Sequence, residues 1–598
     1  MKTYNSRKEV PEKYKWNLDD FYKNDKEFDK DYNEVVKSIP KLKEFKGHLK
    51  DANKLYEFLE LDVKISLIYE NLNVYAYVVN DQELGVEESI KRLNKIEKVE
   101  PLYIQNTSFF EPELLNLSKE EFKDLFKKNS ELNKYKKYLE NVYRNKEHYL
   151  DEDKKNIVTS LVNAMDKFEL TSSNLINNEI DYHTINVDGE EVQLALTNLR
   201  RFMRNKDEKI RKQAYFQFYK EIDKHSTTFA TLLDSYVGMN NELAKIHNFK
   251  SSWEEKLFYQ KLSNKVYDTL IETTENNLAP LHRYYELTTK LQNKDKLRSY
   301  DLSLLDISSK DIKYSIEDAI KLVKKATKPL GEEYSKKINK IFDNHYIDYC
   351  QYKGKQSGGY SISTYTRDSR ILMSFNDSLA SVSTIAHEGG HNVNHQYMLE
   401  NNLPHYRRNS SVVAEVTSLM NECLLSNYLA ENGKNKDEKL MGLANIIEVF
   451  ISNFYGAVRE GKIEKEMYEL VENNGTLTKE YLNDLVYKSK ELYGGKHREL
   501  DEYTKNSWAV RSHYYMNFYL FSYSISIAVA TSIANKIING DKETLNKYIE
   551  FLKAGSDKDI TETFAILGIN LEDKKVYEDA VNFFNSLLDK YEKIYNEE

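Results

Sequence analysis

Apolar residues recur at helical spacing through most of the chain. Between residues 54 and 79 they return about every four positions, which places them on one face of a helix: Leu55, Leu59, Val63 and Leu67. The highly charged stretch 119–145 keeps a similar apolar face. Residues 524–538 form an apolar run rich in small side chains, which predicts a buried helix rather than a membrane span. These patterns predict a mainly α-helical protein.

Three stretches depart from this helical period. Residues 182–194 contain two extended runs on either side of an Asp-Gly pair, which predicts a β-hairpin. Residues 352–361 are the most glycine-dense part of the chain and lack the Gly-Lys-Ser/Thr sequence of a phosphate loop, so we interpret them as a mobile loop. The short apolar run Arg370–Phe375 predicts a strand whose free edge can pair with an extended peptide, or else a buried strand without a ligand.

The composition supports a helical fold and excludes several functions. The 598 residues include only 20 Gly and 7 Pro, well below the usual fractions of about 7 and 5 per cent. A net charge of −9 argues against a nucleic-acid-binding surface. Cys350 and Cys423 lie in no CxxC or Cys/His cluster, so we expect buried free thiols.

The start of the chain and its hydropathy indicate the cytoplasm. The first 16 residues lack the apolar segment of a signal peptide. No run approaches 18 apolar residues, so we expect no membrane-spanning segment and no membrane partner.

The sequence His-Glu-Gly-Gly-His at residues 387–391 is the strongest chemical signal. On a helix, His387 and His391 lie on one face, so their imidazoles can converge on a single metal ion with the carboxylate of Glu388 beside it. A catalytic zinc site usually takes a third protein ligand and keeps one position for water. Glu415 follows 24 residues after His391, beyond a turn, and is our candidate for that ligand.

A metal site with a third histidine does not fit the sequence. In the HExxHxxGxxH pattern, Asn394 and Tyr397 would stand at the Gly and His positions. His395, one turn beyond His391, either contacts substrate or a ligand residue or makes an ordinary polar contact. The pair Gly389-Gly390 lowers helix propensity by roughly 1 kcal/mol for each glycine, which the close approach of another element to this helix would explain.

Two polar residues after Glu415 are candidates for orienting the metal ligands. Ser418 and Glu422 follow Glu415 by three and seven residues and so lie on a similar helix face. Either they hold a ligand side chain in place or they are polar residues of the surface.

Together these motifs resemble a known family. The His-Glu-Gly-Gly-His motif, the preceding residues 370–376 and the Glu-Val-x-Ser sequence at Glu415 are similar to oligoendopeptidase F, a bacterial branch of the thimet oligopeptidase and neurolysin family of zinc peptidases. The resemblance implies a zincin-type, mainly α-helical fold with a deep substrate channel and a small β-element next to the metal helix. It also implies an N-terminal helical domain at residues 1–200, ending in the hairpin near 182–194, and a catalytic domain at residues 201–598.

The aromatic stretch 508–523 is a second candidate site. Its spacing would place His513, Tyr519 and Tyr523 along neighbouring faces of a helix, a pattern more typical of a core. The resemblance implies a His/Tyr cluster opposite the metal, so we expect His513, Tyr515 and Tyr519 to act in catalysis. The expected substrate-binding residues are Tyr523, Gly359, Leu372 and Ser374.

The sequence therefore predicts a zinc endopeptidase that hydrolyses short unfolded oligopeptides. We expect one Zn²⁺ per chain, since two imidazoles and a carboxylate favour zinc, and Glu388 as the base that activates water. A zinc carboxypeptidase or another metallohydrolase on the same fold is the main alternative. An inactive helical scaffold would have a damaged ligand set. The sequence leaves the oligomeric state and the side-chain preference open.

Overall fold

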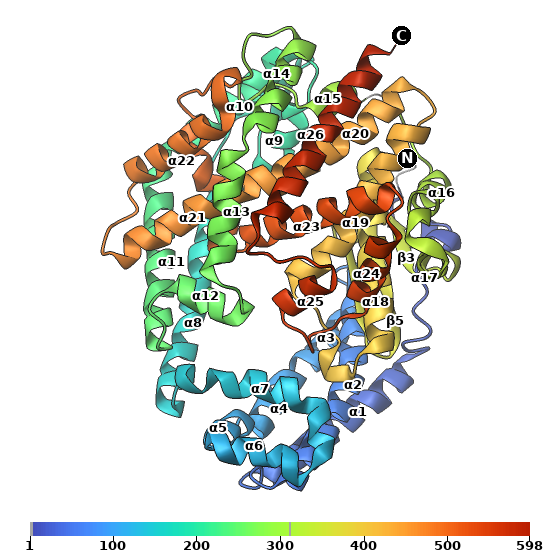
Figure 1. The fold of residues 1–598 in the computed structure, drawn as a ribbon, viewed down its shortest axis with the longest axis vertical. Helices are drawn as coiled ribbons and strands as arrows, with labels where there is room; N and C mark the ends of the chain where they lie inside the picture. Colours follow the sequence, from blue (N-terminus) through green and yellow to red (C-terminus); the bar gives the residue numbers. More distant parts are fainter. Residues whose placement is uncertain (1–3, 310–311, 598) are drawn as a thin grey trace. The chain divides into compact units, whose positions relative to one another are not determined.

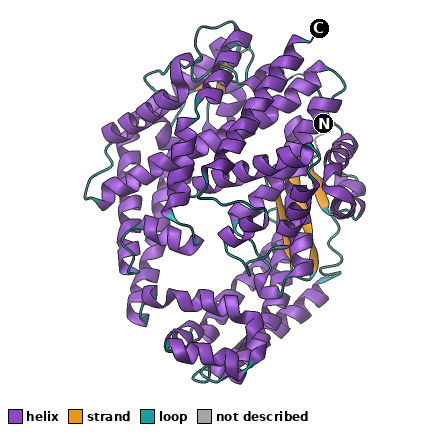
Figure 2. Cartoon of the chain, viewed as in Figure 1, coloured by secondary structure: helices purple, strands orange, loops and turns teal. Residues whose placement is uncertain are grey.

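Helices form nearly all of the regular structure in this computed structural model, which describes residues 4–309 and 312–597 (Figures 1 and 2). The mainly α-helical fold class predicted from the sequence is confirmed. The chain divides into two compact units, each assembled from three segments. Unit 1 comprises Met1–Glu147, Ile312–Tyr428 and Lys536–Gly568, and unit 2 comprises His148–Asp311, Leu429–Asn535 and Ile569–Glu598.

Unit 1 carries helices from the N-terminal, central and C-terminal parts of the chain. They are α1 (Asp25–Leu42), α2 (Ala52–Gln82), α3 (Glu87–Glu97), α4 (Val99–Thr107), α5 (Phe110–Leu115), α6 (Lys119–Lys128), α7 (Lys136–Arg144), α16 (Ile316–Ala326), α17 (Gly331–Asp343), α18 (Leu379–Asn401), α19 (Ser411–Asn432, whose last residues enter unit 2), α24 (Lys542–Lys553) and α25 (Ile560–Ile566). The long helix α2 begins where the Asp51 carboxylate accepts hydrogen bonds from the backbone N–H groups of Asn53 and Lys54. Its buried face joins an apolar core that extends to Leu372.

A three-stranded sheet in unit 1 supports the metal helix. Its order is β3 (Ile347–Cys350), β5 (Arg367–Phe375) and β4 (Tyr360–Thr364), with β3 parallel and β4 antiparallel to β5. Helix α18 packs on β5 and β4 and also contacts α16, α17 and α24. Because neighbours cover α18 on several sides, even polar residues such as Asn392 and Asn394 are buried along it.

The loop between β3 and β4 is fastened to the sheet by a buried lysine. Lys355 Nζ donates hydrogen bonds to Asp348 Oδ1 at 2.6 Å, to the Cys350 carbonyl at 2.9 Å and to the Met373 carbonyl at 2.7 Å. Its charge is thus paired and its donors are occupied, as a buried ammonium group requires. The first half of the glycine-dense stretch is therefore anchored.

Unit 2 is built from a second set of helices and one hairpin. The helices are α8 (Glu152–Asn174), α9 (Leu196–Met203), α10 (Glu208–Lys224), α11 (Ser226–Ile246), α12 (Ser252–Gln260), α13 (Asn264–Asn276), α14 (Ala279–Gln292), α15 (Leu304–Ser308), α20 (Lys436–Phe450), α21 (Ala457–Glu472), α22 (Lys479–Gly494), α23 (Leu520–Ile538, whose last residues enter unit 1) and α26 (Lys574–Asn596). Strands β1 (Thr184–Val187) and β2 (Glu190–Gln193) form the hairpin, with Asp188 and Gly189 in its turn. Both turn residues have positive φ, which the Asp-Gly pair favours.

Two helical segments are long and apolar enough to cross a membrane by length and composition. They are Lys436–Glu472 and Leu520–Ile538, and 61% and 78% of their apolar windows are buried inside the protein. Such burial is typical of core helices. The prediction of a buried helix at residues 524–538 agrees with the burial of Leu520–Ile538.

Candidate metal centre and active site

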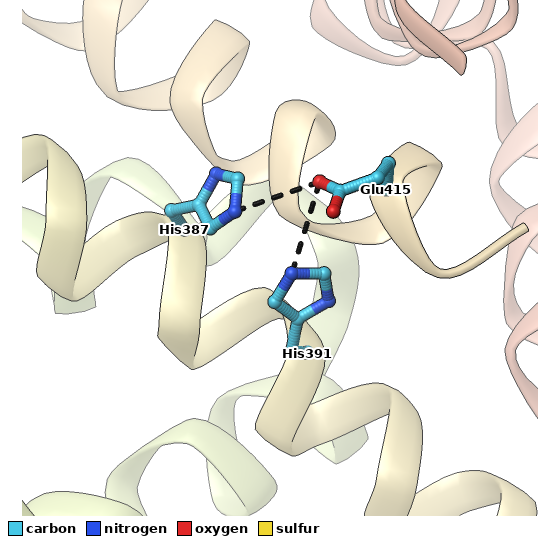
Figure 3. A group of neighbouring side chains, drawn as sticks. All are labelled: His387, His391 and Glu415. Atoms are coloured by element: carbon cyan, nitrogen blue, oxygen red, sulfur yellow. Dashed lines mark ion pairs between the residues drawn. The ribbon is translucent and has the colours of Figure 1, made fainter. Parts of the chain in front are cut away.

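Two histidines of α18 and one glutamate of α19 come together in unit 1 (Figure 3). His387 and His391 are four residues apart, so one turn of α18 brings both imidazoles to the same face. Glu415 Oε2 lies 3.5 Å from His387 Nε2 and 3.8 Å from His391 Nε2. The three side chains therefore surround one common position between the two helices.

The spacing of these three atoms suits a divalent metal ion. Zinc ligands lie about 2.0–2.1 Å from the metal in a tetrahedral arrangement, which separates two ligand atoms by roughly 3.4 Å. The separations of 3.5 and 3.8 Å are close to this value, and all three candidate ligand atoms lie within 4.8 Å of one another. Two imidazoles and one carboxylate can thus hold a metal and leave one position for water or substrate.

Glu422 fixes the orientation of His387. The Nδ1 of His387 lies 2.6 Å from Glu422 Oε1, and Ser383 Oγ donates to Glu422 Oε2 at 3.0 Å. Because an ionised carboxylate only accepts hydrogen bonds, His387 carries its hydrogen on Nδ1 and presents the Nε2 lone pair toward Glu415 and the metal position. Burial alone would lower the pKa of His387, but its hydrogen bond to Glu422 raises the pKa to about 9, so the ring must release its Nε2 proton when it binds a metal.

Ser418 and Gly390 set the position of Glu415. Ser418 Oγ lies 3.0 Å from Glu415 Oε2 and donates to the Glu415 carbonyl at 2.9 Å. Where the two helices cross, a Cβ on Gly390 would lie 2.5 Å from the Thr417 carbonyl oxygen and 2.8 Å from Ser418 Cα. Only glycine permits this approach, because both atoms belong to the backbone of α19.

Glu388 stands beside the ligands in a desolvated environment. The residue is 7% exposed. Burial raises the pKa of its carboxyl group to about 7; the His387 charge lowers this pKa, and the Glu415 charge raises it. A Cβ on Gly359 would lie 3.9 Å from Glu388 Oε1, so Gly359 lies beside this carboxylate. A carboxyl group with a pKa near neutrality is well suited to accept and release a proton.

His395 does not join the metal group. Burial lowers its pKa to about 4, and its Nδ1 lies 3.2 Å from Ser369 Oγ on β5. Of the two interpretations of this residue, the geometry fits the ordinary polar contact. It ties α18 to the central strand.

The comparison with known proteins identifies the family. Residues 201–583 match peptidase family M3, and residues 113–182 match the family described as Oligopeptidase F. The first match covers more than half of the chain. This chain belongs to peptidase family M3. The family resemblance stated from the motifs is therefore confirmed, and the M3 chain is a metallopeptidase with peptide substrates, in which His387, His391 and Glu415 are the group that can hold the metal.

Individual relatives match the M3 chain over nearly its whole length. It is 30% identical to an oligoendopeptidase F homolog of Borreliella burgdorferi, over 99% of this chain and 100% of the relative. The crystal structure of oligoendopeptidase-F from Enterococcus faecium matches with a TM-score of 0.71 and 26% identity, over 96% of this chain and 100% of that one. A crystal structure from Chlamydophila abortus matches with a TM-score of 0.91 at 24% identity, over 99% and 100% of the two chains, which shows the same fold.

The edge strands of this sheet are β3 and β4, and not β5 as the sequence suggested. Strand β5 is central and pairs with β3 on one side and with β4 on the other, so the prediction of a free edge on residues 370–375 is wrong. Leu372 is fully buried, and Ser374 Oγ donates to the side chain of Gln351. The run is apolar because it lies between α18 and the core of unit 1, whereas β4 is the partly exposed strand.

The aromatic stretch of the M3 chain forms two short turns and a loop before the next helix. The prediction that His513, Tyr519 and Tyr523 share one helix is wrong: His513 lies in a 3₁₀ turn at Ser512–Tyr515, and α23 begins only at Leu520. Asn517 and Phe518 have φ of 39° and 59°, in the left-handed region that breaks a right-handed helix.

The structure nevertheless brings part of the aromatic cluster together within unit 2. The rings of Tyr519 and Tyr523 are 5.2 Å apart, and those of His513 and Tyr523 are 6.0 Å apart. Tyr515 packs instead against Tyr236, whose hydroxyl donates to the Tyr515 carbonyl at 2.7 Å. All four predicted side chains are half-buried. Their roles in catalysis and substrate binding stay predictions.

Two residues that the sequence analysis missed hold the left-handed turn. Asn517 Oδ1 accepts hydrogen bonds from the hydroxyls of Tyr236 and Tyr468 at 2.8 and 2.9 Å. The buried Glu464 of α21 accepts the Phe518 N–H at 2.6 Å. An asparagine, which tolerates left-handed backbone, within an aromatic run is the local signal for this turn. A glutamate on the apolar face of α21 gave no indication of its partner 54 residues away.

Glu464 gives the first testable prediction. Burial raises its pKa to about 8, although the Phe518 N–H and Lys256 lower it. Because the pKa in the folded chain exceeds the ordinary value of 4.5, the stability from this group is present below about pH 4.5 and is lost as pH rises through about 8. Glu464→Gln cannot ionise, so its melting temperature should rise relative to wild type between pH 5 and 9, by about 2 °C or more.

The matched control for this variant is Glu469→Gln, on the exposed side of the same helix. It should show no such trend in thermal unfolding followed by circular dichroism at each pH. A constant difference between Glu464→Gln and wild type across this range would contradict a buried, proton-bearing Glu464.

Proposed function

We propose that this chain is a zinc-dependent endopeptidase that cleaves short, unfolded oligopeptides. The observation that carries the proposal is the convergence of His387, His391 and Glu415 beside the buried Glu388. The names of its relatives, oligoendopeptidase F among them, support the oligopeptide substrate class. An inactive scaffold would be expected to have lost part of the ligand set, and the four residues are all present.

Each residue of the metal group has a distinct task in this proposal. His387 and His391 supply neutral imidazoles and Glu415 supplies a carboxylate. Glu422 keeps His387 in the tautomer that binds, and Ser418 holds Glu415 in place. When bound there, zinc supplies Lewis-acid activation of water and of the scissile carbonyl.

Glu388 moves the protons of the reaction. Its carboxylate takes a proton from the attacking water as the water adds to the peptide carbonyl, and then gives that proton to the leaving amine as the C–N bond breaks. Burial beside the ligands keeps the pKa of the Glu388 carboxyl group at about 7, so the group can both take up and release a proton in neutral solution. His513, Tyr515 and Tyr519 are proposed to donate hydrogen bonds to the developing oxyanion.

The substrate is proposed to bind as an extended strand. The edge strand β4 is proposed to offer backbone donors and acceptors to a peptide, and Gly359 just before it lies beside Glu388. Tyr523 is proposed to contact substrate side chains. Leu372 of the central strand supports β4 by pairing with Tyr360, and Ser374 holds Gln351 in the loop between β3 and β4. An extended peptide spans about 3.3 Å per residue, and the family resemblance implies a deep substrate channel, so we propose substrates of roughly 6 to 20 residues.

Internally quenched peptides of 5 to 25 residues test this proposal, with cleavage products identified by mass spectrometry. We expect internal cleavage that a chelator stops and zinc restores, with a maximum rate at intermediate lengths. Release of single C-terminal residues would indicate the carboxypeptidase alternative instead. Restoration by another divalent ion but not by zinc would overturn the choice of metal.

Tyr519 gives a prediction on the aromatic cluster. Tyr519→Phe removes one hydroxyl donor without changing the ring packing against Tyr523, so kcat should fall about a hundredfold while zinc content stays at wild-type level. The matched control is Tyr487→Phe at an exposed position of α22, which should leave kcat unchanged. Steady-state kinetics that show an unchanged kcat in Tyr519→Phe would remove this hydroxyl from the oxyanion site.

We also propose that the enzyme acts in the cytoplasm. Its two most apolar helices are largely buried in its own core, which leaves them no role as membrane anchors. Activity confined to the cytosolic fraction of the producing cell is expected, and activity in the membrane fraction would contradict the proposal.

A further inference from the structure

Unit 1 contains a cavity with a volume of about 600 Å³. Its walls come from α1, α2, α4 and α7, from the segment before α7, from the turn between α18 and α19 and from the loop after α24. None of His387, Glu388, His391 and Glu415 lines it. A cavity of this size falls within the range of small-molecule binding sites.

Two hydrogen-bond acceptors in the cavity wall lack donors. Asp62 accepts one hydrogen bond, from the Tyr103 hydroxyl at 2.7 Å on Oδ1, and no described residue donates to its Oδ2. His405 Nε2 donates to the Lys134 carbonyl at 2.9 Å, and its Nδ1 is buried without a partner. Burial lowers the pKa of His405 and keeps its ring neutral, so Nδ1 offers a lone pair. The Nδ1 atom of His405 has almost no accessible surface, so the acceptor that a ligand can meet is Asp62 Oδ2, and it points to a ligand that supplies an N–H group.

The surroundings of these acceptors favour a cationic donor. Four tyrosines line the cavity, Tyr69, Tyr103, Tyr135 and Tyr138, and aromatic faces attract ammonium groups. Burial raises the pKa of the Asp62 carboxyl group, although the Tyr103 hydroxyl and the Arg407 charge lower it. An ammonium ion carries three N–H donors and one positive charge, so it can donate to the open oxygen of Asp62.

A positive side chain on the same wall is available for an anion. Arg407 is occupied, because its Nε donates to Glu70 at 2.8 Å and its Nη1 to the Pro404 carbonyl at 2.5 Å. Arg408 is exposed and has no hydrogen-bond or ion-pair partner among the residues that the structure describes. The rest of the wall is mostly aliphatic and includes Leu59, Val63 and Val99. The cavity thus combines two carboxylates, Asp62 and Glu100, with the side chains of Arg407 and Arg408 and an apolar surface.

We propose that this cavity binds a short apolar peptide of two or three residues as a zwitterion, with its α-ammonium group on Asp62 and its carboxylate on Arg408. This inference rests on the proposed function, because such short peptides are products of oligopeptide cleavage. The cavity would then be a product-binding site separate from the metal centre. The contacts that define it belong to unit 1 alone.

Isothermal titration of the zinc-loaded full-length chain with Leu-Leu tests the proposal. We expect Asp62→Asn to weaken binding at least tenfold, and N-acetyl-Leu-Leu to bind wild type at least tenfold more weakly than Leu-Leu. Arg408→Gln, at an exposed position with little risk to folding, should weaken Leu-Leu but leave Leu-Leu-amide unchanged. Equal affinity of wild type and Arg408→Gln for Leu-Leu, or no binding at millimolar peptide, would overturn the proposal.

The same titration with Glu388→Gln separates this inference from the proposed function. Glu388 does not line the cavity, so the variant should bind Leu-Leu with wild-type affinity even though it cannot cleave peptides. Loss of Leu-Leu binding in Glu388→Gln would place the peptide at the metal centre and contradict a separate site. If the wild-type chain cleaves no peptide yet binds Leu-Leu in an Asp62- and Arg408-dependent manner, the proposed function fails and the cavity assignment stands.

Discussion

Glu388→Gln should reduce peptide hydrolysis about a thousandfold while the chain keeps its metal. The amide has nearly the shape of the carboxyl group but cannot take a proton from water, and general acid-base catalysis contributes roughly 10²- to 10⁴-fold. Because Glu388 is not among the three converging ligands, metal content should stay at the wild-type level. The measurement is kcat/KM on an internally quenched peptide, together with metal analysis of the same sample.

The matched control for this variant lies three turns further along α18. Glu400→Gln changes a carboxylate that pairs with Lys337 and lies outside the metal group, so activity should be unchanged. If Glu388→Gln retained a tenth or more of wild-type activity with its metal intact, Glu388 would lose its role as the proton carrier.

Gly390→Ala should have the second large effect, on metal binding and stability together. The added Cβ would lie 2.5 Å from the Thr417 carbonyl oxygen and 2.8 Å from Ser418 Cα. Since neither backbone atom can rotate away, α19 must shift and carry Glu415 away from the two imidazoles. Overpacking of this kind typically costs about 1–3 kcal/mol. We expect a lower melting temperature and metal affinity weakened at least tenfold, measured by competition with a chromogenic chelator.

The neighbouring glycine provides the control. A Cβ on Gly389 would meet Ile338 Cδ1 at 2.9 Å, which is the movable end of a flexible side chain. Gly389→Ala also gains helix propensity of roughly 1 kcal/mol, so its net effect should be small. Equal behaviour of the two alanine variants would show that the helix crossing does not set the position of Glu415.

The metal group could be derived from the sequence because it depends on local geometry. Two histidines four residues apart on a helix must share a face, and the spacing to Glu415 is short enough for a second helix to return beside the first. The hairpin could also be predicted from the sequence, since an Asp-Gly pair between two extended runs favours a tight turn. The apolar helical spacing along α2 led to the mainly helical fold for the same reason.

The features that escaped prediction depend on contacts between distant parts of the chain. The sequence of β5 is apolar and would suit a central strand or an edge strand. Only its pairing with both β3 and β4 shows that it is central. The aromatic loop leaves the helical path because Glu464 and Tyr236 hold the backbone at Asn517 and Phe518. Nothing in the sequence distinguishes Lys355 from other lysines, whereas in the fold its Nζ donates to the carbonyl groups of Cys350 and Met373. The spacing of residues within one segment does not indicate which distant residues that segment will contact.

Anomalous diffraction at the zinc edge from crystals of the zinc-loaded chain tests the metal centre most directly. The proposed site predicts one strong peak per chain, about 2.0–2.1 Å from His387 Nε2, His391 Nε2 and a carboxylate oxygen of Glu415. The absence of a peak there, or a peak held by other residues with Glu415 turned away, would contradict the metal centre and with it the proposed hydrolysis.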